Sequence, residues 1–175
     1  MKREKGSILM VGADRGEQLL IKEVFRELRI PDLLYIVRDG EEAIDFLKGE
    51  GGYADRKKFK FPTILLTELR MPKIDGFDLL LFIKRSNLII IPTIVLTSSS
   101  DVDDVNRAYL LGANAFHNKP VELEGLLMVL KNIYDYWARV EIPDVDENGV
   151  VKPVSMKKIH PVIGRKKASE TVKDI

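Results

Sequence analysis

Three polar residues, Glu68, Thr97 and Lys119, each follow or end an apolar run of the sequence. Together they offer a carboxylate, a hydroxyl and an ammonium group, which can bind a charged ligand or pair with one another. Open α/β sheets place their chemistry at the carboxyl ends of the strands, next to the loops that follow. The three residues can therefore form one site if their apolar runs are parallel strands of one sheet.

Five apolar runs alternate with amphipathic segments along the chain. A run that is apolar throughout is typical of a parallel strand buried on both faces. The alternation predicts an α/β fold, a doubly wound five-stranded parallel sheet in a flavodoxin-like (βα)5 three-layer sandwich. The predicted strands are Ser7–Val11, Leu33–Val37, Ile64–Leu66, Pro92–Thr97 and Ala115–His117.

The segments between the runs have the periodicity and the start signals of helices. Apolar residues recur three and four positions apart from Leu20 to Leu28, and the strongest such stripe extends from Leu123 to Trp137. A further helix is expected to start at Asp75-Gly76. Aspartates that precede helical segments at capping spacing predict the N-caps, which are Asp14, Asp39 and Asp101.

Composition limits the class of protein. The chain has 175 residues, 45% of them hydrophobic and 31% charged, and a net charge of +1, as is ordinary for a globular protein with a core. It has no cysteine, which excludes disulfides and thiolate metal sites. No apolar run approaches the roughly 20 residues that span a bilayer. We expect a cytoplasmic protein that has no membrane contact.

The regular pattern stops near Glu141. The expected organisation is a domain over residues 1–140 and a C-terminal extension, 141–175, that is partly disordered or forms an interface. The last part of the extension, residues 151–175, is basic. Within the domain, Gly49–Lys60 is rich in Gly and Lys and predicts a polar loop.

Three motifs, taken together, carry a resemblance to a known family. They are Glu68-Leu69-Arg70-Met71-Pro72-Lys73-Ile74-Asp75-Gly76, Leu96-Thr97-Ser98, and Gly112-Ala113-Asn114-Ala115-Phe116 before Lys119-Pro120. With these motifs, residues 6–140 resemble a response-regulator receiver domain of two-component phosphorelay signalling, the CheY-like family. The loop Gly49–Phe61 and the ending Tyr136–Val140 resemble the stand-alone subfamily that works with cyanobacterial and other bacterial phytochromes.

The resemblance implies a role for several positions, but the acidic ones have changed. Receiver domains accept a phosphoryl group on an aspartate four residues before the loop proline, where this chain has Glu68. Two adjacent acidic residues after the first strand help to hold Mg²⁺ in the family, and here they are Gly12 and Ala13. The family's hydroxyl, aromatic switch and lysine positions are Thr97, Phe116 and Lys119.

These departures predict a degenerate site. Mg²⁺ requires near-octahedral oxygen ligands, and the side chains of Gly12 and Ala13 have no oxygen. The carboxylate of Glu68 lies one methylene further out than that of aspartate, about 1.5 Å. Phosphoryl transfer depends on positioning and charge neutralisation. We therefore expect a pseudo-receiver, with no bound Mg²⁺ or other cofactor, no catalytic residue, no enzyme activity and no Mg²⁺-dependent phosphorylation.

Two interpretations of Glu68 remain open at this point. Its carboxylate could mimic the phosphorylated state by reaching Lys119 and Thr97, or the same contacts could only satisfy buried charge. Phe116 is either a rotameric switch or an ordinary core aromatic residue.

The expected function is that of a protein-interaction module in two-component signalling. The resemblance suggests as partner a sensor histidine kinase or phytochrome-type kinase, or a second copy of the chain. Both would use the face formed by Val102–Leu111, Ala115–Asn118 and Leu123–Arg139. The aromatic candidates for its anchors are Tyr109, Phe116 and Trp137.

Two alternatives belong to other classes. A phosphorylatable regulator could use Asp14 in a shifted Mg²⁺ site, although one residue's shift along a strand end turns a side chain elsewhere. Nucleic acid could bind the basic tail of residues 151–175, but no aromatic residues interleave its charges, so we expect a solvated tail instead.

Overall fold

A computed structural model describes residues 7–12, 15–27, 34–86, 88, 91–137, 139–141, 143 and 145–152. Within these residues, five strands alternate with five α-helices, and a short 3₁₀ helix, η1 (Gly51–Tyr53), follows the second of them. The strands are β1 (Ile8–Val11), β2 (Leu34–Val37), β3 (Ile64–Thr67), β4 (Thr93–Thr97) and β5 (Ala115–Asn118). The helices are α1 (Arg15–Glu27), α2 (Gly40–Lys48), α3 (Gly76–Arg85), α4 (Val102–Leu110) and α5 (Leu123–Trp137).

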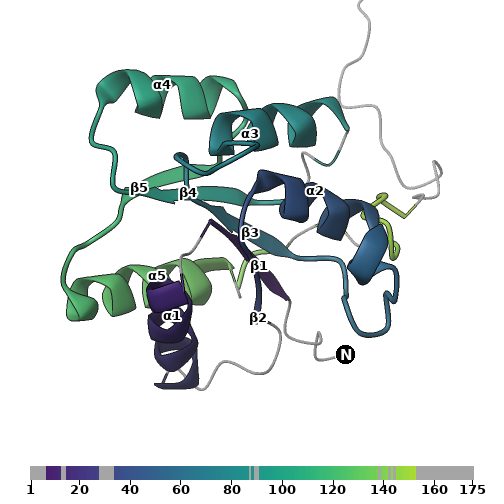
Figure 1. Cartoon of the computed structure of the whole chain (residues 1–175), viewed down its shortest axis with the longest axis horizontal. Helices are drawn as coiled ribbons and strands as arrows, with labels where there is room; N and C mark the ends of the chain where they lie inside the picture. Colours follow the sequence, from purple (N-terminus) through teal and green to yellow (C-terminus); the bar gives the residue numbers. More distant parts are fainter. Residues whose placement is uncertain are drawn as a thin grey trace, which may run out of the picture.

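The strands form one parallel sheet in the order β2-β1-β3-β4-β5. Helices α1 and α5 cover one face, and α2, α3 and α4 cover the other (Figure 1). The predicted doubly wound three-layer architecture is therefore confirmed. The order also places the ends of β1, β3 and β4 next to one another, with β5 beside β4.

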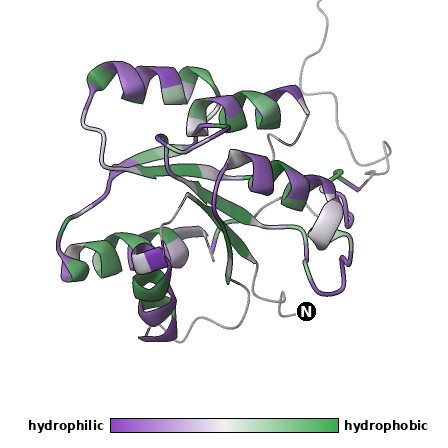
Figure 2. Ribbon diagram, viewed as in Figure 1, coloured by the Kyte–Doolittle hydropathy of each residue, from purple (hydrophilic) through white to green (hydrophobic). Residues whose placement is uncertain are grey.

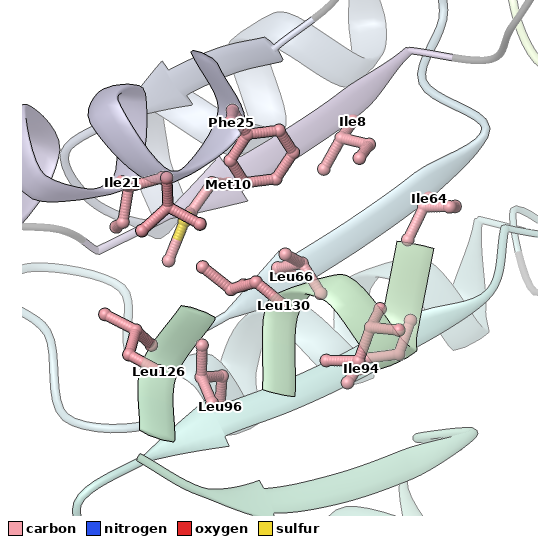
Figure 3. Packing of buried hydrophobic residues seen from close by; sticks show 12 residues of the cluster. Ile8, Met10, Ile21, Phe25, Ile64, Leu66, Ile94, Leu96, Leu126 and Leu130 are labelled. Atoms are coloured by element: carbon pink, nitrogen blue, oxygen red, sulfur yellow. The ribbon is translucent and has the colours of Figure 1, made fainter. Parts of the chain in front are cut away.

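The core lies in two layers, one on each side of the sheet. On the α1 and α5 side, Ile21 and Phe25 of α1 and Leu126 and Leu130 of α5 pack on alternate residues of the central strands (Figure 3). The strands consist mostly of hydrophobic residues, and the helices contain both hydrophobic and hydrophilic residues (Figure 2). Among the described residues, no helix combines the length and apolar character that crossing a bilayer requires.

Aspartate side chains begin three of the helices. Asp39 accepts a hydrogen bond from the backbone N–H of Glu42, and Asp101 accepts one from that of Asp103, which confirms both predicted N-caps. Asp75 caps α3 in the same way. These caps satisfy N–H groups that a helix start leaves without partners. The predicted cap Asp14 lies outside the described residues.

The segment Gly49–Lys60 differs from the predicted polar loop. It contains η1, and its Tyr53 and Phe59 are half-buried against Phe46 of α2, with the centroids of the Tyr53 and Phe46 rings 5.0 Å apart. Arg56 donates hydrogen bonds to the carbonyls of Phe46 and Leu47 at the end of α2, at 2.8 and 2.6 Å. Most of the segment is exposed and irregular, as predicted, but the packing of its aromatic residues was not predicted, because aromatic residues spaced along an irregular backbone produce no periodic pattern.

Part of the C-terminal extension packs against the domain. Val145 and Val151 form an antiparallel bridge around a turn in which Asp146 accepts hydrogen bonds from two backbone N–H groups. Gly149 of this turn is buried, and a Cβ atom there would lie 2.0 Å from the ring of Phe61. The turn is thus in close contact with the core. The expected division at residue 140 remains a prediction, and residues 153–175 lie outside the described residues.

Candidate functional site

The carboxyl ends of three neighbouring strands bring Glu68, Thr97 and Lys119 together. Thr97 is the last residue of β4, and Glu68 and Lys119 directly follow β3 and β5. The backbone ladder continues one residue beyond the strands, since the N–H of Lys119 donates to the carbonyl of Thr97 at 2.7 Å and the N–H of Glu68 donates to that of Val11 at 3.1 Å. The sheet thereby fixes the positions from which the three side chains extend.

Lys119 lies between two carboxylates. Its Nζ is 2.9 Å from Oε2 of Glu68 and 2.9 Å from Oε1 of Glu17, in the first turn of α1. The Lys119 and Glu68 side chains are only 13% and 12% exposed, and that of Glu17 is 31% exposed. A contact with the backbone also holds the Glu68 carboxylate of this largely buried ion pair in place. Glu68 Oε1 accepts a hydrogen bond from the N–H of Leu69 at 2.7 Å.

Hydrogen bonding outweighs burial in setting the charge of this pair. Burial alone would raise the pKa of Glu68, but hydrogen bonds from Thr97 and Lys119 leave that pKa below its ordinary value. Burial alone would lower the pKa of Lys119, but hydrogen bonds to Glu68 and Glu17 leave that pKa above its ordinary value. Both groups are therefore charged at neutral pH.

The two pKa shifts define the pH range in which the pair stabilises the fold. The contribution of Glu68 is present above the pKa it has in the unfolded chain and is lost as the pH falls through its lower folded value. The contribution of Lys119 is present below its unfolded pKa and is lost as the pH rises through its higher folded value. Between these limits the pair has its full effect.

Gly12 stands at a position where the family has an acidic residue that helps to hold its metal, and there is no space for a side chain there. It has a φ of +90°, and a Cβ atom added there would lie 2.3 Å from Sδ of Met71 and 2.9 Å from Cβ of Glu68. A side chain that carried a carboxylate would thus meet both a positive φ and a filled space. Ala13 and Asp14 lie outside the described residues. The residues around Gly12 do not fit Mg²⁺ as the family holds it, because Glu68 already binds an ammonium group and Gly12 has no side-chain oxygen.

No cluster of three or more His, Asp or Glu side chains suited to a metal is found in the part of the chain that the structure describes. The site instead opens into a cleft of about 990 Å³. Besides Glu68, Thr97 and Lys119, the cleft is lined by both basic and acidic side chains, namely Arg15, Arg38, Arg70, Glu17 and Glu42. The cleft therefore carries mixed charge.

A second charged network connects the loop after β3 with α4. Arg70 donates to both oxygens of Asp104 at 2.9 and 2.8 Å, and the hydroxyl of Ser99 donates to Asp104 at 2.6 Å. The sequence analysis missed Arg70 and Asp104, because nothing in their spacing relates a loop to a helix 34 residues later. It also missed Glu17 as a site residue. Here a signal existed, since Glu17 lies in the first turn of the helix that follows the first strand.

The three predicted aromatic anchors differ in exposure. Tyr109 on α4 is 50% exposed, whereas Phe116 of β5 and Trp137 of α5 are half-buried and pack against the core clusters. Phe116 packs with Leu69 and Phe77, between the sheet and the helices α3 and α4. Leu110, which the aromatic criterion did not select, is 76% exposed next to Tyr109. Of the three anchors, Tyr109 alone is well placed to contact a partner without moving.

A scan of protein families matches residues 8–131 to the response regulator receiver domain. The probable methanogenesis regulatory protein FilR2 of Methanothrix harundinacea is 37% identical over 132 residues, which cover 74% of this chain and 82% of FilR2.

Solved structures agree with this match. The phosphorylated cyanobacterial phytochrome response regulator RcpA matches with a TM-score of 0.73 and 31% identity, over 81% of this chain and 100% of that chain. The Mn²⁺-bound form of response regulator Rcp1 matches with a TM-score of 0.70 and 33% identity, over 79% of this chain and 99% of that chain. The chain therefore belongs to the response regulator receiver domain family of two-component signalling, and it is close to the phytochrome-associated members Rcp1 and RcpA.

Proposed function

We propose that this receiver domain is an interaction module of cytoplasmic two-component signalling and works without Mg²⁺-dependent phosphorylation. The single observation that carries the proposal is the ion pair between Glu68 and Lys119. The lysine position that holds a phosphoryl group in the family is here engaged by a carboxylate of the chain itself. Glu68 is thus a constant charge at this position, and signalling is carried by binding.

The surroundings of Gly12 support the same proposal. A cation held by the family's acidic pair neutralises charge as a phosphoryl group is transferred, and transfer depends mainly on such positioning and neutralisation. Gly12 supplies no side-chain ligand, and the space beside it is filled by Met71. Phosphoryl transfer to Glu68 is therefore unfavourable for two reasons. Its side chain is one methylene longer than that of aspartate, and an acidic residue that would help to hold the cation is replaced by Gly12.

The partner surface that we propose is the face formed by α4, β5 and α5. Its exposed apolar side chains include Val102, Tyr109 and Leu110 on α4, and Leu110 is the most exposed of these. Large apolar side chains at the centre of a contact contribute most of its binding energy. A second copy of the chain or a histidine kinase of the phytochrome type is the partner that fits this family.

Replacing Leu110 by glutamate tests this face, and Leu19→Glu is its matched control. Leu19 is similarly exposed, at 71%, but lies on α1. In analytical ultracentrifugation we expect the wild-type chain to dimerise, Leu110→Glu to weaken dimerisation by at least about tenfold through the buried charge, and Leu19→Glu to associate like wild type. A monomeric wild-type protein, or equal association of the two variants, would contradict dimerisation through this face.

A further inference from the structure

Helix α4 buries very little apolar surface. Of its residues, Asp104 and Ala108 are buried, and only the second of these is apolar. The neighbouring helix α3 buries several large apolar side chains, namely Phe77, Leu79, Leu80 and Ile83. Most of the stability of a helix in a protein comes from packing such a face on the core. The position of α4 therefore depends on other contacts.

A buried carboxylate supplies the closest of these contacts. Asp104, in the first turn of α4, is only 7% exposed. It accepts two hydrogen bonds from Arg70, in the loop after β3, and one from the hydroxyl of Ser99, in the loop after β4. A buried carboxylate that loses its donors is costly, so these contacts resist separation of α4 from both loops. We call Arg70, Ser99 and Asp104 the α4 clasp.

The remaining polar contacts of α4 with α3 lie at the surface. The guanidinium of Arg107 lies over the ring of Phe77, 4.1 Å from its centroid. At the other end of the helix, Lys84 of α3 donates to the carbonyl of Leu110 at 2.9 Å. Both cationic side chains are exposed to water, where such contacts contribute little. The clasp is therefore the main polar attachment of α4.

We propose that the α4 clasp holds α4 in one position against the loop after β3 and thereby sets the conformation of the partner face. The clasp lies next to the charged site, because Arg70 follows Glu68 by two residues and the N–H of Ser99 donates to the hydroxyl of Thr97 at 3.3 Å. Through it, the loops that carry the site position the helix that carries Tyr109. The inference rests on the proposed function, which assigns partner binding to the face that contains α4.

Hydrogen exchange of the backbone amides of α4 tests the clasp in the wild-type chain, Arg70→Met and Asp104→Asn. We expect the rates in α4 to rise at least about tenfold in both variants, because a segment opens locally when its attachments are lost. Rates in α1 and α5 should stay at their wild-type values. The double variant should exchange no faster than either single variant, because both changes remove the same contact.

Three results would overturn the clasp. They are unchanged exchange in α4, an equal rise in all helices, which indicates general destabilisation, and a rise in the double variant that equals the product of the two single effects. If Asp104→Asn does not fold, Arg70→Met keeps the measurement available, because the side chain of Arg70 is 64% exposed.

Arg26→Met is the matched control. Arg26 is also an exposed arginine in an ion pair, with Glu23, but both residues lie on α1. We expect α4 to exchange in this variant as it does in wild type. Faster exchange of α4 in Arg26→Met as well would show that the effect belongs to the loss of any surface arginine and would contradict the clasp.

Dimerisation of the same variants tests the link to the partner face. In analytical ultracentrifugation we expect Arg70→Met to dimerise at least about threefold more weakly than wild type, because only a fraction of its chains holds α4 in the binding position. Equal dimerisation by a variant whose α4 exchanges faster would overturn the link alone. A monomeric wild-type chain would overturn the proposed dimer and the link, whereas the exchange of α4 would still decide whether the clasp holds the helix.

Discussion

Replacing Gly12 by aspartate is expected to lower the free energy of unfolding by about 2–5 kcal/mol, although it returns an acidic residue to a position that the family uses for its metal. The positive φ of Gly12 is one cause, since side chains strain the backbone there. The other is space. Met71 can move its flexible end away from a new Cβ, but Cβ of Glu68, at 2.9 Å, is attached to the backbone and can move little. Chemical denaturation measures the loss.

A matched glycine separates the two causes. Gly112 also has a positive φ, +105°, but a Cβ there would meet no atom within 4 Å. Gly112→Asp should therefore cost only the backbone strain, about 1–2 kcal/mol. Adding Met71→Ala to Gly12→Asp should recover part of the packing cost and none of the strain. Equal losses for Gly12→Asp and Gly112→Asp would show that the space beside Gly12 is not restricted.

Replacing Gly76 by alanine is expected to cost about 2–4 kcal/mol, because the first residue of α3 lies directly against the site loop. A Cβ on Gly76 would be 2.3 Å from the carbonyl oxygen of Glu68 and 2.8 Å from Cα of Leu69. These are backbone atoms, so no change of rotamer relieves the contact. Either α3 or the backbone that carries Glu68 must shift, and the hydrogen bond from the N–H of Gly76 to the carbonyl of Leu69, at 2.9 Å, is disturbed.

Gly52→Ala is the control for this prediction, because nothing lies within 4 Å of a Cβ at that position. We expect its free energy of unfolding to stay within about 0.5 kcal/mol of wild type, as for most surface substitutions. Thermal unfolding monitored by circular dichroism compares the two variants. Equal stability of Gly76→Ala and Gly52→Ala would contradict the close packing of α3 against the site loop.

The sequence predicted the architecture well because its signals are local. Strands such as Thr93–Thr97 are buried throughout, and their unbroken apolar runs indicated this. Aspartates such as Asp39 mark helix starts through hydrogen bonds that span three residues. The meeting of Glu68, Thr97 and Lys119 followed from the geometry of any parallel sheet, in which the carboxyl ends of the strands share one edge.

Contacts between distant segments could not be predicted in the same way. The salt bridge from Arg70 to Asp104 depends on how far α4 lies from the loop after β3, which packing decides. The half-buried position of Phe116 depends on the space between α3, α4 and the sheet. Glu17 could have been assigned to the site from its place after the first strand, but its capping spacing with Asp14 favoured a local role.

The central claim is that this receiver domain has a metal-free site occupied by its own charges. Calorimetric titration with beryllofluoride, a phosphoryl analogue, in the presence and absence of saturating Mg²⁺ tests it most directly, with the phosphorylated relative RcpA as the positive control. The account predicts no Mg²⁺-dependent binding to this chain, because Gly12 offers no side-chain ligand and Lys119 is engaged by Glu17 and Glu68. Tight binding of beryllofluoride that requires Mg²⁺ would contradict it.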